Sequence, residues 1–346
     1  MNGGLLTRRG LLLGGLAAAM RRLHVPSVSI AVIGGGGIVW AEAYGDASVR
    51  TLYQAASLSK VVTAVAALRL VDDGRLGLNT DVNAELRSWH LPPNPFSRND
   101  PVTLRGLLSM TGGVNVPGYT GYPRGAELPD LRQILDGTPP ANSPPVHVVR
   151  EPGSAYAYSG GGYEIVQALI EDATGQGFAR ATTRLVLRPA GMGESTFDEP
   201  RGDDVARGHL GSGSEIRGGW RVVPELGAGG LWSCPSDLAW LLIAVARAWR
   251  GEMNMLLTKR TAREMLTRQN GGPYGLGGAV VGPESDPVLM KRGQNPGYQS
   301  YMLVFPARGQ GIVVMTDSDN GTTLTTSLIR HAGTLLRWTL PDLLPD

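Results

Sequence analysis

The sequence has one cysteine, Cys234, and only three lysines, Lys60, Lys259 and Lys291, in 346 residues. A single cysteine excludes an intrachain disulfide and any zinc or iron–sulfur site built from several thiolates. The chain has 32 basic residues, and all of them except these three lysines are arginine. Arginine stays protonated in proteins, whereas burial can make a lysine amine neutral. Each lysine is therefore a candidate for a site that needs an amine.

The sequence also lacks a large net charge and has no block of five like charges. Its 32 basic and 30 acidic residues give a net charge of +2. We therefore expect neither nucleic acid nor an anionic membrane surface as a partner. Hydrophobic residues make up 42% of the chain, and its 49 glycines and 24 prolines show no fixed period. This composition indicates a globular protein with long loops.

The sequence has no long apolar run. The apolar stretch near the amino terminus, within residues 7–19, has about ten residues, too few to span a bilayer, so no integral membrane span is expected. It follows two arginines and resembles a twin-arginine export signal. Alternatively, Leu12, Leu16, Ala19 and Leu23 form one face of an amphipathic first helix. Residues 1–19 are thus either an export signal or a helix, and the protein is either exported or cytoplasmic.

The pattern along the chain predicts strands at both ends and helices between them. Two β-rich runs in residues 25–45 flank four glycines and predict a hairpin. Further strands are expected at residues 298–305 and 311–316. Helices are expected at residues 57–73, 163–174, 236–250 (capped by Ser236) and 324–338.

This order predicts an α/β (α+β) protein in which an antiparallel sheet is built from both chain ends and flanked by helices. We expect residues 20–74 and 225–346 to form the sheet domain. Residues 75–224 are expected to be an inserted, mostly helical subdomain.

Several common catalytic motifs are missing. The chain has no G-x-S-x-G, no H-E-x-x-H and no P-loop, and its five histidines are isolated. It does contain S-L-S-K at Ser57–Lys60, at the start of the predicted buried helix. Three-residue spacing places the hydroxyl and the amine on one helix face, where a neutral Lys60 could accept the Ser57 proton. The alternative is an N-cap serine, since Ser-x-x-Lys also arises by chance.

Two further motifs follow in order. Residues 151–163 read E-P-G-S-A-Y-A-Y-S-G-G-G-Y and place Tyr158 before a predicted helix, and residues 291–298 read K-R-G-Q-N-P-G-Y. Ser-x-x-Lys, Tyr-Ser-x and Lys-x-Gly at these separations resemble the serine β-lactamase and penicillin-binding-protein superfamily. The resemblance is to its class C-like branch, with the family VIII carboxylesterases and D-amino-acid peptidases, and it extends over nearly the whole chain.

The resemblance implies a role for each motif residue. Ser57 would be the acylated nucleophile, Lys60 its base and Tyr158 the phenol that relays a proton to the leaving group. Lys291 would be the cation of the third motif, beside Tyr158.

The resemblance also implies how the substrate would be held. The backbone N–H groups of Ser57 and Gln294 would form the oxyanion hole, and Gly293 would let the substrate approach the strand edge.

Some positions depart from the family pattern. Where class C β-lactamases have Tyr-x-Asn, this chain has Gly160, so the side-chain amide that contacts the β-lactam is missing. β-Lactamases have lysine at the position of Lys291, whereas many esterase-like members have histidine there. Arg292 is bulkier than the usual Thr or Gly. Met110 replaces a histidine, which we interpret as a packing change.

Two tyrosines in the glycine- and proline-rich loop 112–130 are further candidates. Tyr119 and Tyr122 could line an acyl or leaving-group pocket, or they could be ordinary exposed loop tyrosines. By contrast, we expect Cys234 to be a small buried residue and Lys259 a solvated surface charge.

The sequence thus predicts a serine hydrolase that needs no metal or cofactor and works through an acyl-enzyme on Ser57. Its substrate would be a small-molecule ester, lactam or amide, with small esters preferred. The alternatives are a β-lactamase or D-alanyl carboxypeptidase, an acyltransferase, and a catalytically silent binding member of the same fold. The oligomeric state is left open by the sequence.

Overall fold

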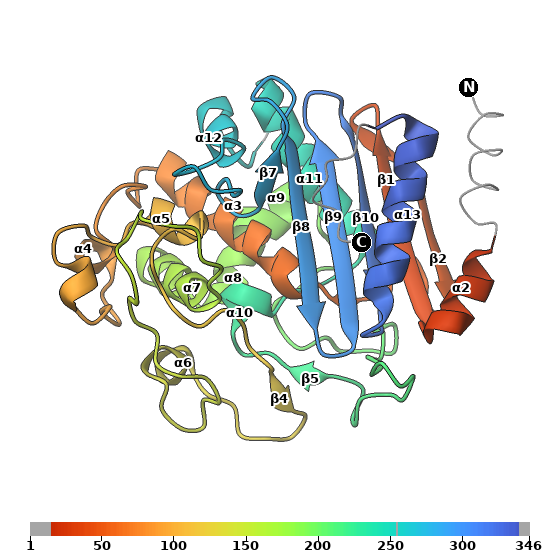
Figure 1. Ribbon diagram of the computed structural model, residues 1–346, viewed down its shortest axis with the longest axis horizontal. Coiled ribbons are helices and arrows are strands. Elements are labelled where there is room, and N and C mark those ends of the chain that lie inside the picture. Colours follow the sequence, from red (N-terminus) through yellow and green to blue (C-terminus); the bar gives the residue numbers. More distant parts are fainter. Residues whose placement is uncertain (1–14, 254, 339–346) are drawn as a thin grey trace.

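In the computed structural model, which describes residues 15–253 and 255–338, a six-stranded antiparallel sheet forms the core (Figure 1). Its strand order is β2-β1-β10-β9-β8-β7. The amino-terminal strand β1 pairs with β10 near the carboxyl end, so the sheet is built from both chain ends, as predicted. The strands are β1 (Ser27–Gly34), β2 (Gly37–Gly45), β7 (Ala279–Val281), β8 (Val288–Asn295), β9 (Tyr298–Phe305) and β10 (Gln310–Thr316).

The predicted hairpin of residues 25–45 is confirmed as β1 and β2. Gly35 and Gly36 form its turn with φ angles of 61° and 77°, a conformation that favours glycine because it has no Cβ. Side chains of β1 then alternate between two apolar clusters. Ile30 packs on one face of the sheet and Ala31 on the other, which requires helices on both faces.

Helices cover each face of the sheet. On one face lie α2 (Leu16–Leu23) and α13 (Gly321–Leu336), and on the other lie α3 (Ser59–Asp72) and α11 (Pro235–Arg250) (Figure 1). Helix α3 is buried on nearly all sides, as its continuous apolar sequence predicts. The expected cap of α11 is wrong: Cys234 is the N-cap residue and Pro235 opens the helix, because proline fits the first helical position.

Residues 75–224 contain one long helix, α7 (Gly161–Thr174), and otherwise short elements joined by loops. None of their strands belongs to the six-stranded sheet. The division into two domains stays a prediction. The short elements are α4 (Val82–Glu85), η2 (Pro95–Ser97), α5 (Leu104–Leu108), β4 (Tyr122–Pro123), α6 (Leu131–Asp136), α8 (Phe178–Thr182), the π-helix η3 (Thr183–Leu187), α9 (Arg188–Ala190) and β5 (Arg221–Val222).

Five other short elements of the described residues lie outside residues 75–224. Strand β3 (Tyr53–Gln54) pairs with β6 (Trp232–Ser233). Between β3 and α3 lies the 3-10 helix η1 (Ala56–Leu58), so Ser57 precedes the α-helix that was expected to begin with it. The segment α10 (Leu226–Gly229) contacts α3 and α7, and α12 (Lys259–Met265) packs on α11.

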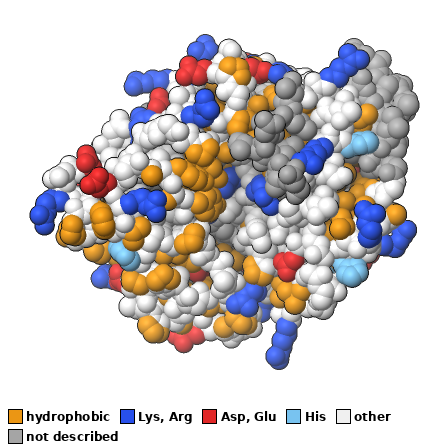
Figure 2. Space-filling model, in the orientation of Figure 1, with side chains coloured by type: hydrophobic (Ala, Val, Ile, Leu, Met, Phe, Trp, Pro, Cys, Tyr) orange, Lys and Arg blue, Asp and Glu red, His pale blue; other side chains and the backbone are white. Residues whose placement is uncertain are grey.

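The predicted amino-terminal helix lies only partly within the described residues. Leu16 and Met20 of α2 are buried, in agreement with an amphipathic helix, whereas Leu12 and the arginines of the candidate export signal lie outside the described residues. Within residues 15–253 and 255–338, no helix has the length and apolar character needed to cross a membrane. Basic and acidic side chains of these residues are dispersed over the face shown in Figure 2.

Candidate active site

Ser57 and Lys60 lie side by side at the junction of η1 and α3. Nζ of Lys60 is 3.3 Å from Oγ of Ser57 and donates a second hydrogen bond, of 2.8 Å, to the carbonyl oxygen of Ala228. The Lys60 side chain is only 2% exposed. Ala56, directly before Ser57, has a φ of 50°, a strained conformation for a residue with a Cβ. The serine is thus held on a constrained turn beside a buried amine.

Tyr158 approaches Ser57 from the loop that precedes α7. Its hydroxyl donates a hydrogen bond of 2.9 Å to Oγ of Ser57. Met110 fixes this loop on both sides of the tyrosine, since its carbonyl oxygen accepts from the N–H of Ala157 and its sulfur from the N–H of Ser159. Met110 therefore positions the Tyr158 loop in addition to packing.

Lys291 on β8 completes the group. Its Nζ donates to the hydroxyl of Tyr158 at 3.0 Å and to that of Tyr274 at 3.1 Å. The structure thus brings the side chains of all three motifs into one chain of hydrogen bonds, Lys60–Ser57–Tyr158–Lys291. Tyr274 extends this chain.

The two lysines change the acidity of Tyr158. Burial raises the pKa of this phenol. The charges of Lys60 and Lys291 and the hydrogen bonds to the phenol have a larger, opposite effect, and they bring the pKa down to about 7. The ammonium groups lie 5.1 Å and 4.6 Å from the centre of the Tyr158 ring. Burial in turn lowers the pKa of Lys291, and the Tyr158 phenolate partly opposes that shift. Tyr158 can therefore gain or lose a proton near neutral pH.

Strand β8 runs directly against the backbone of Ser57. A Cβ added to Gly293 would lie 2.3 Å from the carbonyl oxygen of Ala55 and 3.2 Å from the nitrogen of Ser57. This close approach requires glycine. Arg292 and Gln294, on either side of it, are exposed.

A cavity of about 540 Å³ opens over these groups. The residues predicted from the sequence that line it include Ser57, Lys291, Tyr119, Arg292, Gly293 and Gln294. Gly160 and Tyr122 are not part of its lining. Tyr122 is buried, and its hydroxyl accepts a hydrogen bond from the backbone of Asn142. The lining is aromatic and basic, with no carboxylate among its described residues: Ser57, Lys60, Pro117, Gly118, Tyr119, Tyr156, Tyr158, Val223, Ala228, Gly229, Pro273, Tyr274, Ala279, Met290, Lys291, Arg292, Gly293, Gln294, Asn295 and Tyr301.

The ring of Tyr119 occupies the space next to Gly160. A Cβ added to Gly160 would lie 3.0 Å from a ring carbon of Tyr119 and 3.4 Å from the carbonyl oxygen of Val116. A side chain as large as asparagine would therefore collide with Tyr119 at this position.

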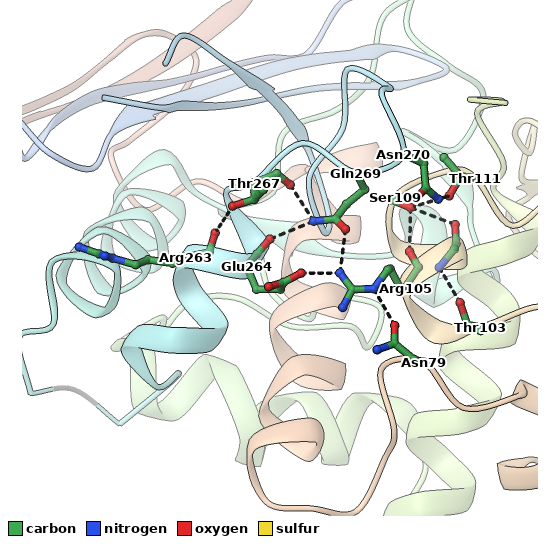
Figure 3. A network of polar contacts seen from close by, with 11 residues as sticks. Asn79, Thr103, Arg105, Ser109, Thr111, Arg263, Glu264, Thr267, Gln269 and Asn270 are labelled. Atoms are coloured by element: carbon green, nitrogen blue, oxygen red, sulfur yellow. Dashed lines mark hydrogen bonds and ion pairs between the residues drawn. The ribbon is translucent and has the colours of Figure 1, made fainter. Parts of the chain in front are cut away.

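A polar network anchors the loop that carries Tyr274 (Figure 3). Arg105 on α5 hydrogen-bonds Glu264 on α12 and Gln269 after it, and the N–H of Gln269 donates to the carbonyl oxygen of Tyr274. Asn270 reaches Thr111 on the other side. The network fixes the tyrosine that receives the second hydrogen bond of Lys291.

Three further residues near this site were not predicted from the sequence. Tyr274 lies in the glycine-rich stretch G-G-P-Y-G-L-G-G, which resembles any other loop. Glu164 on α7 and Glu225 before α10 are both fully buried. Glu164 was detectable as a carboxyl on the apolar side of a predicted helix. Among the described residues, no three His, Cys, Asp or Glu side chains are grouped so as to hold a metal ion.

Comparison with known proteins establishes the family of the chain. A family model described as Beta-lactamase matches residues 16–333. The chain belongs to the β-lactamase family. Its homologues with this fold are serine hydrolases, so the chain is a member of a serine hydrolase family.

Individual proteins resemble the chain at low identity. Protein flp of Staphylococcus aureus (strain N315) is 24% identical over 322 residues, which are 86% of this chain but only 61% of that protein. The D-amino acid amidase of Ochrobactrum anthropi SV3 superposes with a TM-score of 0.75 at 20% identity, over 96% of this chain and 98% of the amidase.

A third similar protein is EstCE1, a hydrolase with promiscuous acyltransferase activity. It superposes with a TM-score of 0.72 at 20% identity, over 94% of this chain and 99% of EstCE1. At these identities, the two structural likenesses establish the shared β-lactamase fold.

Proposed function

We propose that this protein is a serine hydrolase that forms an acyl-enzyme on Ser57 and acts on small carboxylic esters. The observation that carries the proposal is the position of Oγ of Ser57, which lies 3.3 Å from an amine (Lys60) and 2.9 Å from a phenol (Tyr158). A serine hydroxyl needs an adjacent base to act as a nucleophile. Two titratable neighbours let one group accept a proton while the other donates one.

In the acylation step, the amine form of Lys60 accepts the Ser57 proton while Oγ attacks the ester carbonyl carbon. The tetrahedral intermediate then collapses, and Tyr158 donates its proton to the departing alkoxide. The phenolate of Tyr158 then recovers a proton from the ammonium of Lys291, to which it is hydrogen-bonded at 3.0 Å. Water attacks the acyl-enzyme in the second step, and the reverse proton transfers release the acid and free Ser57.

The oxyanion that forms on the carbonyl would be held by the backbone N–H groups of Ser57 and Gln294. Pro296 and Gly297 form the two-residue turn between β8 and β9, so Asn295 and Tyr298 form the hydrogen-bonded pair beside it. Antiparallel pairs alternate, and the N–H of Gln294 therefore points away from β9. Donors of this kind contribute about 10²- to 10³-fold each to the rate.

The preference for esters rests on Gly160 and Tyr119. Gly160 supplies no side-chain amide to hold a substrate amide, and the Tyr119 ring fills the space beside it. An ester has no N–H that must be paired when it enters an aromatic cavity, whereas an unpaired amide is costly to bury.

A second candidate is a β-lactamase or D-alanyl peptidase. The described lining of the cavity contains the basic side chains of Lys60, Lys291 and Arg292 and no carboxylate. This charge favours substrates with an anionic group, as β-lactams and D-alanyl peptides have.

Turnover of a chromogenic short-chain ester and a chromogenic cephalosporin tests both candidates. We expect the wild-type protein to hydrolyse the ester faster, and Ser57→Ala to lower ester turnover by roughly 10³-fold or more. The exposed Ser212→Ala is the control for replacing a serine. Faster turnover of the cephalosporin would favour the second candidate, and full ester turnover by Ser57→Ala would reject the acyl-enzyme mechanism.

A further inference from the structure

The short segment α10 is held between α3 and α7 by two parallel sets of hydrogen bonds. Oε1 of Gln167 on α7 accepts from the N–H of Gly227 at 2.8 Å, and the Gly227 carbonyl oxygen accepts from Oγ1 of Thr63 on α3 at 2.8 Å. The next residue of α10 repeats this pattern with different side chains.

In the second set, Oε1 of Glu164 accepts from the N–H of Ala228 at 2.9 Å. The carbonyl oxygen of Ala228 accepts from Nζ of Lys60 at 2.8 Å, and the same Nζ lies 3.3 Å from Oγ of Ser57. Glu164 and Gln167 are three residues apart on one face of α7. Both bind α10, but only the residue bound by Glu164 contacts the amine beside Ser57.

Glu164 lies in surroundings that disfavour a charge. It is fully buried, its Oε2 has no hydrogen-bond partner among the described residues, and both carboxyl oxygens of the buried Glu225 also lack one. Burial and the nearby Glu225 raise the pKa of Glu164 well above its usual value, while the hydrogen bond from Ala228 and the charge of Lys60 oppose this. A buried carboxyl without a paired cation is neutral, and a neutral carboxyl still accepts a hydrogen bond.

We propose that Glu164 is a positioning residue that holds Lys60 against Ser57 through the backbone of Ala228, and that it acts as a neutral hydrogen-bond acceptor rather than as the charged partner of Lys60. The inference rests on the proposed role of Lys60 as the base for Ser57. A neutral Glu164 fixes the position of the amine and does not stabilise its protonated form. Without this hydrogen bond, Ala228 and the amine can move, and small displacements of a catalytic group are costly in rate.

Phosphonylation of Ser57 by a fluorophosphonate tests this inference, because the dependence of the rate on probe concentration separates binding from the chemical step. We expect Glu164→Ala to lower the limiting rate roughly 10- to 100-fold, with the half-saturating concentration within about twofold of wild type. Glu164→Gln keeps the acceptor and should restore the rate to within about threefold of wild type.

Gln167→Ala is the matched control, because it removes the equivalent bond to the neighbouring residue of α10. We expect its limiting rate to equal that of the wild type, even where its melting temperature falls as far as that of Glu164→Ala. Glu164→Asp, whose carboxyl is one methylene shorter and falls short of the Ala228 N–H, takes the place of Glu164→Ala if that variant does not fold. The same decrease in rate is expected for it.

Three results would overturn the inference. Wild-type rates in both Glu164→Ala and Glu164→Asp would show that the hydrogen bond to Ala228 has no role in the chemical step. A decrease in Gln167→Ala equal to that in Glu164→Ala would show that the hydrogen bond of Glu164 only supports the position of α10 as a whole. A decrease in Glu164→Gln as large as in Glu164→Ala would show that a charge is needed. A wild-type protein that is not labelled on Ser57 would instead reject the proposed function, and the inference with it.

Discussion

The hydroxyl of Tyr158 donates a hydrogen bond of 2.9 Å to Oγ of Ser57. These residues are 101 positions apart in the chain, and the loop before α7 brings them together. Because Lys60 and Lys291 flank the phenol, one proton can be exchanged among four side chains without leaving the site. This arrangement lets the proposed mechanism use the same groups in acylation and deacylation.

The acidity of Tyr158 is directly measurable. In a pH titration followed by phenolate absorbance, we expect one tyrosine to ionise near the pKa of about 7 and this transition to be absent in Tyr158→Phe. Lys291→Gln removes one of the two cations and should raise the midpoint. The exposed Lys259→Gln is the matched control and should not move it. A Tyr158 that ionises only near the usual value of 10.0 would contradict the proposed electrostatics.

The contact between Gly160 and Tyr119 predicts a stability cost. Gly160→Ala places a Cβ 3.0 Å from the Tyr119 ring, and overpacking of this kind costs roughly 1–3 kcal/mol of unfolding free energy. Tyr119→Ala should relieve most of that cost in the double variant. Gly177→Ala is the control, since a Cβ there meets nothing within 4 Å. Additive effects of the two substitutions in denaturant unfolding would show that the residues do not interact.

The loop network around Arg105 predicts an effect on turnover from residues outside the motifs. Tyr274→Phe removes one acceptor of Lys291 and should lower kcat roughly 3- to 10-fold, the value of one hydrogen bond. Arg105→Ala, which loosens the Tyr274 loop, should also lower kcat. Arg263→Ala, on the same helix as Glu264 (Figure 3), is the control. A kcat for Tyr274→Phe equal to that of the wild type would exclude Tyr274 from the positioning of Lys291.

Glu225 predicts a pH-dependent stability. Burial raises the pKa of this carboxyl from 4.5 to about 7, so between these values the folded state keeps a proton that the unfolded state releases. The stability contributed by this group is therefore full below pH 4.5 and is lost as the pH rises through about 7.

Glu225→Gln should remove this pH dependence. We expect the variant to gain stability over the wild type as the pH rises, by up to roughly 3 kcal/mol above about pH 7. Denaturant unfolding at several pH values measures this difference, with the exposed Glu127→Gln as the control for loss of one negative charge. A difference that does not change with pH would mean that the pKa of Glu225 is the same in the folded and unfolded states.

The fold could be predicted where its signals are local. The glycine turn of β1 and β2, the apolar run of α3 and the strand Tyr298–Phe305 depend on short stretches of sequence, and the structure confirms them. The cap of α11 was wrong because serine and proline both begin helices, and Pro235 determined the start. The loops of residues 75–224 are held by distant contacts that no local pattern reveals.

The residues of the candidate site likewise include some that the sequence predicts and some that depend on distant contacts. Ser57 and Lys60 are neighbours along one turn, so their proximity follows from spacing, and the resemblance of the motifs to a known family added Tyr158 and Lys291. Tyr274 could not be found, because its position depends on a network between α5 and α12.

The side chains that lie beside Gly160 and Lys60 could not be predicted from the sequence either. The sequence shows that Gly160 lacks a side chain but not that Tyr119 fills the space. The roles of Glu164 and Glu225 depend on the packing of α7 against α10, which involves residues far apart in the chain.

The central claim is that Ser57 carries the acyl group during turnover, and the mass of the protein quenched during ester hydrolysis tests it most directly. We predict an added mass equal to the acyl group, located on the peptide that contains Ser57 and absent from Ser57→Ala. Steady ester turnover by the wild-type protein with no adduct, or with the adduct on another residue, would contradict the account.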